Sequence, residues 1–569
     1  MNRKIADLFR EVADALEIKG VQWKPRAYRK AARTIQSLEK SLDRIYEKEG
    51  KKGLKEIPGI GDSIADHIAQ YIQTGEVEEF TEHLQGVSKG QNKLLDIEGI
   101  GPKTVNTLAK ELGIQSIEDL EDAVKNEKIR ALEGFGKKTE EKMKESLSNY
   151  KANKGRMLLG KALPIAEDMV ASLQKNTPVD RIEYAGSLRR MKETIGDLDI
   201  LAVSKEPEKV MDYFTSQKNV DRVLNKGETK SSVVTDQGLQ IDLRVIQKEH
   251  WGAAELYFTG SKDHNVALRK AAGDQGFKLS EYGLEDSDSG KLQTFDSEKG
   301  VYEKLGYSFI PPQLRENRGE LEAAKNGSLP DLIRVEDVKG DLQMHTNYSD
   351  GQESIQKMAE AAEQMGYEYI AITDHSKATR IANGMDEKAL RKQIAEIESL
   401  HSGIKIIKSA EVEILKDGSL DYPDELLKEL DMVLVTIHSG FLSSEKEMTK
   451  RILKAFENKY VNIFGHPTGR KIGTRKAYQY DFVKIAKEAA DKHIALEINC
   501  SPERLDLNDQ LILKAKEQNV KFSLGTDSHI SSNLDTVRFG VGQAQRGWLE
   551  AGDVINTYSY KKLTSFFSN

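Results

Sequence analysis

The sequence has one cysteine, Cys500, in 569 residues. A single cysteine cannot form a disulfide within the chain, and this fits a protein of the reducing cytoplasm. No apolar run approaches the roughly 20 residues of a transmembrane helix, and the first residues lack the apolar core of a signal peptide. We therefore expect a cytoplasmic protein with no membrane partner.

The chain also lacks an excess of positive charge, since its net charge is −7. This is weak evidence against nucleic-acid binding, because a local basic patch matters more than the total. A composition of 38% hydrophobic and 31% charged residues is typical of globular proteins. The length is sufficient for three or four domains.

Residues 1 to about 150 have apolar residues at helical spacing and contain a repeat. Segments 57–61, 97–101 and 132–136 share an apolar-x-Gly-apolar-Gly pattern, and a helix-like stretch follows each. A Gly-x-Gly turn that opens a helix lets backbone N–H groups approach a phosphate without reading bases. An ordinary helix–turn–helix would explain one copy, but recurrence favours DNA-backbone contacts by Gly59, Gly61, Gly99 and Gly101. The third copy is looser, and we assign it no phosphate contact.

A basic and aromatic stretch lies near the start of this helical region. It consists of Trp23, Lys24, Arg26, Tyr28, Arg29, Lys30 and Arg33. Such a stretch could hold a DNA end. A solvated helix face is the alternative, and we give the two interpretations equal weight.

Three aspartates mark the region from about 155 to 315, where short β-type runs alternate with helical segments. Asp197 and Asp199 are two apart on a probable strand, so both point to one face. Asp242 lies in another β-run and can add a third carboxylate. Three hard oxygen donors suit two Mg²⁺ ions that activate a primer 3′-hydroxyl and stabilise leaving pyrophosphate. Asp-x-Asp alone is usually structural, but an upstream Gly186-Ser187 turn completes the nucleotidyltransferase pattern.

Residues 1 to about 316 resemble the family-X DNA polymerases. The motifs GSLRR (186–190), DLD (197–199), IDLR (241–244) and YFTGS (257–261) follow the helical region in that family's order. The resemblance implies that Asp197, Asp199 and Asp242 bind the catalytic metals, and that Ser187 and Arg190 contact the phosphates of a dNTP. The other nucleotide-site residues that it implies are Gly186, Gly196, Tyr257, Phe258, Gly260, Asn265 and Arg269.

The end-binding region departs from this family at three positions. His67 stands where lyase-competent relatives have the lysine that forms a Schiff base, and an imidazole cannot form that iminium. Ser63 and Glu79 replace lysines of the 5′-phosphate pocket, whereas Lys24 and Tyr28 match it. We therefore expect no lyase chemistry at His67 and weaker recognition of a 5′-phosphate.

Residues 336 to 569 alternate regularly between β-type and α-type segments, which predicts a β/α barrel with its active site at the strand C-termini. Eight residues of ligand chemistry lie in short clusters there: His345, Asp350, His375, Glu411, His438, His466, Asp527 and His529. Any one histidine is more often structural, but five at predicted strand ends favour a metal site. Imidazole with carboxylate suits Mn²⁺, Zn²⁺ or Fe²⁺ better than Mg²⁺.

These clusters resemble the PHP (polymerase and histidinol phosphatase) domain. The resemblance implies a distorted β/α barrel with a multinuclear metal centre that hydrolyses phosphoesters, here by 3′–5′ exonuclease and abasic-site endonuclease action. The family opens with His-x-His, whereas this chain has Gln343-Met344-His345. We expect this glutamine to weaken the nuclease.

The chain as a whole is thus similar to a bacterial family-X DNA polymerase with a C-terminal PHP domain. We expect a helical DNA-end-binding domain (1–85), fingers with further helix-hairpin-helix motifs (86–153), an α/β nucleotidyltransferase palm (154–247), a thumb (248–315), a linker (316–335) and the PHP barrel (336–569). The expected partners are gapped or primer–template DNA and dNTPs. Three alternatives stay open: a nuclease with an inert polymerase half, a DNA-end scaffold with an inert barrel, and a small-molecule phosphatase.

Overall fold

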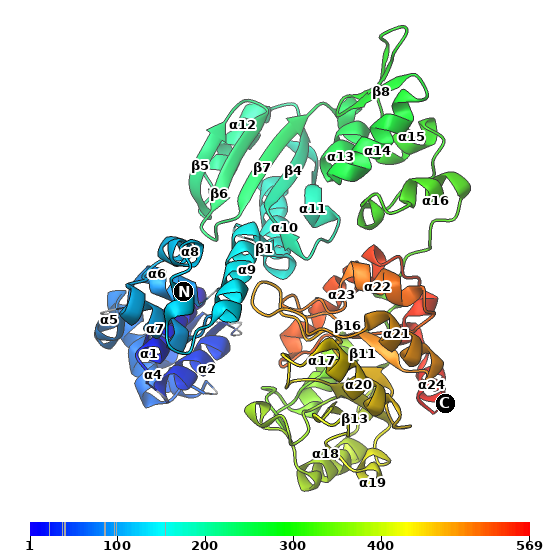
Figure 1. The fold of residues 1–569 in the computed structure, drawn as a ribbon. Helices are drawn as coiled ribbons and strands as arrows, with labels where there is room; N and C mark the ends of the chain where they lie inside the picture. Colours follow the sequence, from blue (N-terminus) through cyan, green and yellow to red (C-terminus); the bar gives the residue numbers. More distant parts are fainter. Residues whose placement is uncertain are drawn as a thin grey trace. The chain divides into compact units, whose positions relative to one another are not determined.

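The computed structural model describes residues 1–568 except 22, 37, 39–40, 58, 85–86, 96, 98 and 154; the side chains of Arg33 and of residues 3, 36, 89, 148–149 and 151–153 also lie outside the described part. The chain divides into two compact units, which are described separately (Figure 1). The first is Met1–Lys154 with Gly473–Lys476, and the second is Gly155–Ile472 with Ala477–Asn569. In the described residues no helix has both the length and the apolar character needed to cross a membrane.

The first unit is built from helices, as the apolar spacing predicted. They are α1 (Asn2–Ile18), α2 (Lys24–Gln36), α3 (Leu42–Lys55), α4 (Asp62–Thr74), α5 (Glu78–Leu84), α6 (Lys89–Leu94), α7 (Pro102–Leu112), α8 (Ile117–Lys125) and α9 (Lys137–Asn153). Apolar residues of α1–α5 form one core cluster, and those of α6–α9 form most of a second.

Each Gly-x-Gly turn opens a helix in this unit. Gly61 precedes α4 and Gly101 precedes α7, while Gly59 and Gly99 adopt φ of 84° and 79°. Residues other than glycine rarely adopt such values, so these turns depend on glycine. The predicted local geometry is confirmed, and the contact with DNA stays a prediction.

The second unit begins with a five-stranded sheet, the expected palm (Figure 1). Its order is β2-β4-β7-β6-β5, with β4 and β7 parallel and the other pairs antiparallel. The elements are β1 (Met157–Leu158), α10 (Leu159–Asn176), β2 (Val179–Tyr184), α11 (Gly186–Arg189), β3 (Thr194–Ile195), β4 (Asp197–Ser204), α12 (Pro207–Thr215), β5 (Val220–Lys226), β6 (Lys230–Thr235) and β7 (Gln240–Ile246). Alternate residues of β4 and β7 pack with α10 and α12 in one apolar cluster.

The expected thumb follows, with a small antiparallel sheet in the order β10-β9-β8. Its elements are α13 (Trp251–Thr259), α14 (Lys262–Gly273), β8 (Phe277–Ser280), β9 (Gly283–Asp286), β10 (Leu292–Gln293) and α15 (Glu298–Lys304). The expected linker 316–335 differs from a simple spacer, because it contains helix α16 (Glu320–Asn326). Ala324 of α16 belongs to the apolar cluster of the thumb, so burial orders this polar stretch.

The C-terminal part is a seven-stranded parallel sheet in the sequential order β11 to β17. A bridge between Met344 of the first strand and Ser528, just after the last strand, brings the two edges together, so the sheet is a nearly closed barrel, as predicted. The strands are β11 (Gly340–Met344), β12 (Tyr369–Ile372), β13 (Lys405–Glu413), β14 (Met432–Thr436), β15 (Ile463–Phe464), β16 (Ala495–Asn499) and β17 (Phe522–Gly525). The helices are α17 (Ile355–Gln364), α18 (Glu387–Ser399), α19 (Asp424–Leu427), α20 (Glu445–Phe456), α21 (Phe482–Asp491), α22 (Asp509–Lys516), α23 (Val537–Arg546) and α24 (Tyr560–Phe567).

Candidate active sites

The three palm aspartates lie side by side on two neighbouring parallel strands. Asp199 of β4 is in register with Asp242 of β7, and Asp197 is two residues before Asp199 on the same face. This face is opposite to the one that α10 and α12 cover, because the intervening Leu198, Ile200, Ile241 and Leu243 belong to that apolar cluster. The structure thus brings together the three carboxylates that the sequence singled out.

The electrostatics of this trio fit a cation. Burial and the carboxylates of Asp197 and Asp242 raise the pKa of Asp199 to about 6. The ammonium of Lys230 lies beside the trio, with its Nζ 3.7 Å from Asp242 Oδ2. Gln240 Nε2 donates to Asp242 Oδ1 at 3.0 Å and orients that carboxylate. Crowded carboxylates repel one another, and a divalent cation held between them relieves the repulsion.

Gly186 is required for the approach of the turn to these carboxylates. It adopts φ of 65°, and a Cβ at this position would lie 2.8 Å from Asp199 Oδ2. A Cβ on Gly196 would likewise lie 2.9 Å from a guanidinium nitrogen of Arg156. A side chain at Gly186 would therefore collide with Asp199, and one at Gly196 would collide with Arg156.

Apart from Gly196, which lies between β3 and β4, the predicted nucleotide-site residues lie on α11, α13 and α14 or directly after them. Arg190 follows α11, and its Nε donates to Glu316 Oε1 at 3.2 Å. Asn265 donates from Nδ2 to the carbonyl of Tyr257 at 2.7 Å, which ties α14 to α13. Arg269 Nε donates to the carbonyl of Asn265 at 3.2 Å. Ser187 lies within α11; Phe258 is near the end of α13 and packs edge-on against Tyr257. Gly260 is the residue after α13. Contact of these residues with a nucleotide stays a prediction.

In the first unit, the residues expected to form the 5′-phosphate pocket surround the carboxylate of Glu79. Glu79 accepts hydrogen bonds from Lys24 Nζ at 2.7 Å, and its oxygens lie 2.9 Å from His67 Nε2 and 3.0 Å from His83 Nε2. Chiefly through the bond from Lys24, the pKa of Glu79 is lowered to about 2. Tyr28 is buried, and its burial raises its pKa to about 12. The lysine and tyrosine that match the family's pocket are therefore already engaged with this acid or buried beside it.

Seven of the eight predicted metal-ligating residues of the barrel form overlapping groups at one end of its strands, and the eighth, His466, lies 3.0 Å from Glu411 through Nε2. Three overlapping groups have ligand atoms within 4.8 Å of one another. They are His345, Asp350, His375 and His529; His375, Glu411 and His438; and His345, Glu411 and Asp527. Shared ligands of this kind suit adjacent cations.

Glu411 is the centre of the cluster and is fully enclosed. Its Oε2 lies 3.2 Å from His345 Nε2 and 3.6 Å from His375 Nδ1, and its Oε1 lies 3.2 Å from His438 Nε2 and 3.0 Å from His466 Nε2. Burial opposes ionisation of this carboxyl, yet these histidines hold its pKa well below the usual range. The Nδ1 atoms of His345, His375 and His466 are buried without a hydrogen-bond partner among the described residues. Buried imidazoles around an ionised carboxylate are ligands that suit a divalent metal ion.

Gln343 lies beside Glu411 with both ends of its amide engaged. Its Nε2 donates to Glu411 Oε2 at 3.1 Å, and its Oε1 accepts from Asn499 Nδ2 at 3.2 Å. The amide thus supports Glu411 through a hydrogen bond, as an outer-sphere residue does.

Sequence reasoning missed several residues that touch these ligands, among them Glu413, Asn499 and Arg504. Glu413 lies 2.9 Å from His438 Nδ1 and accepts from its backbone N–H. Asn499 donates to Asp527 Oδ2 at 3.2 Å, and Arg504 Nε is 3.3 Å from the same oxygen. Glu413 could have been found, because it lies two residues after Glu411 on β13 and so shares its face.

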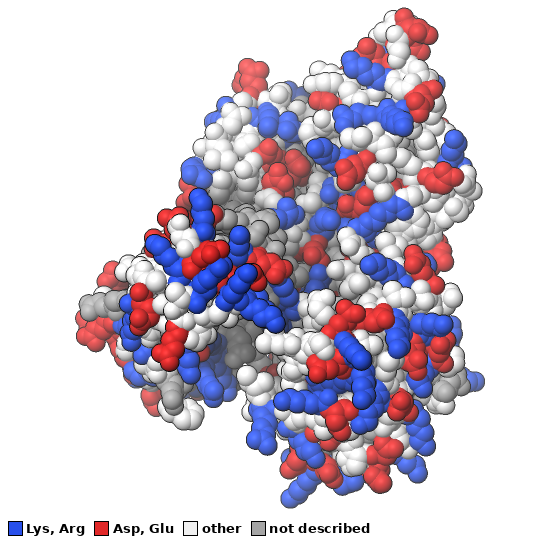
Figure 2. Space-filling model, viewed as in Figure 1, with Lys and Arg blue, Asp and Glu red and all other residues white. Residues whose placement is uncertain are grey.

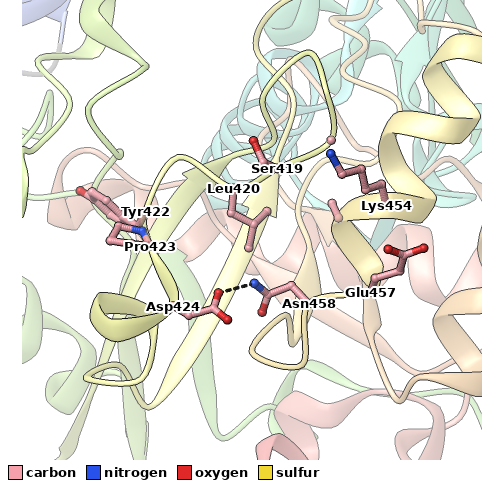
Figure 3. A pocket seen from close by; sticks show the side chains of 10 residues that line it. Ser419, Leu420, Tyr422, Pro423, Asp424, Lys454, Glu457 and Asn458 are labelled. Carbon is pink, nitrogen blue, oxygen red and sulfur yellow. Dashed lines mark hydrogen bonds between the residues drawn. The ribbon is translucent and has the colours of Figure 1, made fainter.

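Neither the distribution of surface charge nor the pocket described below marks the position of a candidate active site. In Figure 2 acidic and basic side chains are interspersed over the face in view, which agrees with the small net charge. A pocket of about 400 Å³ is lined by Ser419, Asp424, Lys454 and Asn458 among others (Figure 3). Its lining includes none of the eight ligand residues, so the metal-ligand cluster lies elsewhere on the barrel.

Comparisons with known proteins agree with this architecture. Residues 1–77 match the helix-hairpin-helix domain family, 92–149 the SAM-like helix-hairpin-helix tandem, 254–316 the DNA polymerase beta thumb and 341–501 the PHP domain. The chain is 37% identical over 573 residues to "DNA polymerase/3′-5′ exonuclease PolX" of Bacillus subtilis (strain 168), which covers 100% of this chain and 99% of that protein. It is 32% identical over 218 residues to a probable phosphatase of Thermoanaerobacter sp. (strain X514), covering 36% of this chain and 84% of that protein. It is 26% identical over 354 residues to DNA polymerase lambda of Arabidopsis thaliana, covering 55% of this chain and 62% of that protein.

Proposed function

This chain belongs to the family of bacterial PolX proteins, and we propose that it fills short gaps in DNA by template-directed nucleotidyl transfer and hydrolyses DNA in its barrel. The observation that carries the first activity is the registered pair Asp199 and Asp242, with Asp197 on the same face. The observation that carries the second is the assembly of seven histidine and acidic side chains into three overlapping ligand groups, with His466 beside Glu411. DNA and dNTPs are the proposed partners, and the cytoplasm is the proposed place of action.

In the palm, Asp197, Asp199 and Asp242 would hold Mg²⁺, which when bound would supply positive charge to the attacking and leaving oxygens. The residues of the chain position the reactants. Backbone donors and the hydroxyl of Ser187 face the triphosphate, and Arg190 adds a positive charge there. Gly186 allows this turn to approach Asp199, so that triphosphate and carboxylates meet.

In the barrel, His345, His375, Glu411, His438, Asp527 and the other ligand residues would hold Mn²⁺ or Zn²⁺, which when bound would activate water for attack on phosphorus. The rest of the site keeps these ligands in place. Glu413 orients His438 through Nδ1, and Gln343 and Asn499 orient Glu411 and Asp527. Removing such outer partners typically costs tenfold to a hundredfold in metal affinity or activity.

Primer extension and degradation on one gapped duplex, run in parallel with Mg²⁺ and with Mn²⁺, test both halves of the proposal. We expect labelled nucleotides to be incorporated with Mg²⁺ and 3′-ends to be degraded with Mn²⁺. Degradation without incorporation would favour a nuclease with an inert palm. Binding of the duplex without either reaction would favour a DNA-end scaffold.

A further inference from the structure

The turn that carries Arg190 is held in place by residues of the barrel within the second unit. Residues 190–193 connect α11 to β3 and lead directly to Gly196 and Asp197. Arg546, at the end of α23, donates from Nη1 to the carbonyl of Arg190 at 2.8 Å. Gln543 of the same helix donates from Nε2 to the carbonyl of Met191 at 3.0 Å.

Packing and charge strengthen this attachment. Met191 adopts φ of 53°, and its side chain lies so close to α23 that a Cβ on Gly542 would be 2.7 Å from it. Arg470 Nη2, from the loop after β15, bonds Glu193 Oε2 at 2.7 Å. Leu505 and Phe539 of the barrel are buried in the apolar cluster of the palm.

Arg546 also acts on the charge of Arg190. The Oε1 atom of Glu316 accepts from Arg546 Nη1 at 3.0 Å and from Arg190 Nε at 3.2 Å. The exposed fractions of these side chains are 1% for Arg546, 14% for Glu316 and 12% for Arg190, so water screens them little. Because two guanidinium groups share one carboxylate, Glu316 does not fully neutralise Arg190.

We propose that Arg546, with Gln543, is a positioning residue of the polymerase site: it fixes the 190–193 turn and divides the charge of Glu316, so that Arg190 keeps positive charge for the triphosphate of a dNTP. This inference rests on the proposed function, because it requires Arg190 to contact that triphosphate. It makes the barrel a structural part of the nucleotidyl-transfer site, independently of any hydrolysis.

The test variant is Arg546→Met, which keeps a long apolar side chain. Removal of the Arg546 guanidinium leaves neither of its acidic partners unpaired. Glu316 still accepts from Arg190, and Asp509 still accepts from Arg318 at 3.2 Å. The matched control is Arg538→Met on the same helix. Arg538 Nη1 also bonds a palm acid, Glu167, at 2.9 Å, but on α10 and away from the 190–193 turn.

Gap filling gives KM for dNTP and kcat, and exonuclease rate and melting temperature are measured on the same preparations. Loss of a charge-assisted hydrogen bond should raise KM about tenfold in Arg546→Met, while kcat changes less than about threefold. Arg546→Lys should lie between this variant and the wild type, and Arg538→Met should match the wild type. In the double variant Glu316→Gln, Arg546→Met, KM should return toward the wild-type value, because Arg190 is then no longer neutralised.

Equal KM values for Arg546→Met, Arg538→Met and the active wild-type protein would overturn the inference and leave the proposed function standing. A parallel fall of kcat, exonuclease rate and melting temperature would also overturn it, since this indicates packing alone. A wild-type protein that incorporates no nucleotide would overturn the proposed function and the inference together.

Discussion

Replacement of Gln343 by histidine tests how the barrel holds its metals. Gln343 is fully buried, donates to Glu411 and accepts from Asn499. In Gln343→His these two hydrogen bonds are exchanged for an imidazole next to the central carboxylate. Gly525 lets this side chain lie against β17, because a Cβ on Gly525 would be 2.6 Å from the Cβ of residue 343.

The expected gain follows from the chemistry of the two side chains. The amide oxygen of glutamine is a weaker donor than imidazole for Mn²⁺ or Zn²⁺, and here Asn499 already occupies it. We expect Gln343→His to tighten Mn²⁺ binding about tenfold, or ~1.4 kcal/mol, and to raise the nuclease rate when Mn²⁺ is limiting. Gln343→Met has the same length without either hydrogen bond, and it should bind less metal than the wild type because Glu411 loses its support.

The assay is metal stoichiometry together with the exonuclease rate over a Mn²⁺ titration. The wild type should need added Mn²⁺, whereas His438→Ala and Asp527→Ala should have no measurable rate. A wild type without nuclease activity at any Mn²⁺ concentration would refute this reasoning and favour a barrel kept for its structure. Unchanged metal binding in both variants of residue 343 would refute the role given to this position.

Three further predictions concern the other parts of the chain. Borohydride treatment on an incised abasic substrate should yield no trapped peptide from residues 62–72, because His67 cannot form an iminium; a recovered peptide would contradict this. Gly186→Ala should lower kcat for incorporation about a hundredfold, because its Cβ would displace Asp199, and it should leave exonuclease activity intact; retained kcat would place the catalytic carboxylates elsewhere. Although burial opposes it, Arg315 and Arg189 lower the pKa of Glu298 to about 2, below an unperturbed 4.5. Stabilisation by this carboxylate is thus present above pH 4.5 and is lost as pH falls toward 2. Glu298→Gln should lower the melting temperature at pH 7. The difference in melting temperature between this variant and the wild type should shrink as the pH falls from 4.5 toward 2, and a constant difference would contradict the ion-pair origin.

The sequence predicted the local geometry of both sites but not the contacts between distant segments. The spacing of two residues placed Asp197 and Asp199 on one face, and the structure confirms this. The register that sets Asp242 beside Asp199 could not be predicted, because it depends on the pairing of two strands whose aspartates are 43 positions apart in the sequence. Histidines at strand ends indicated the barrel site, since parallel strands bring their C-termini together.

Tertiary burial explains what sequence patterns failed to predict. The polar stretch 316–335 contains helix α16 and Glu316, which pairs with Arg190 and Arg546. Such residues have no local signal, because their partners are up to 230 positions away.

The central claim is that one chain holds two separate catalytic centres. Its most direct test is to measure incorporation and 3′-end degradation in parallel on the same gapped duplex, with wild type, Asp242→Ala and Asp527→Ala. We expect Asp242→Ala to lose incorporation by several orders of magnitude while degradation persists, and Asp527→Ala to show the reverse. Incorporation that survives in Asp242→Ala, or loss of both activities in either variant, would contradict the account.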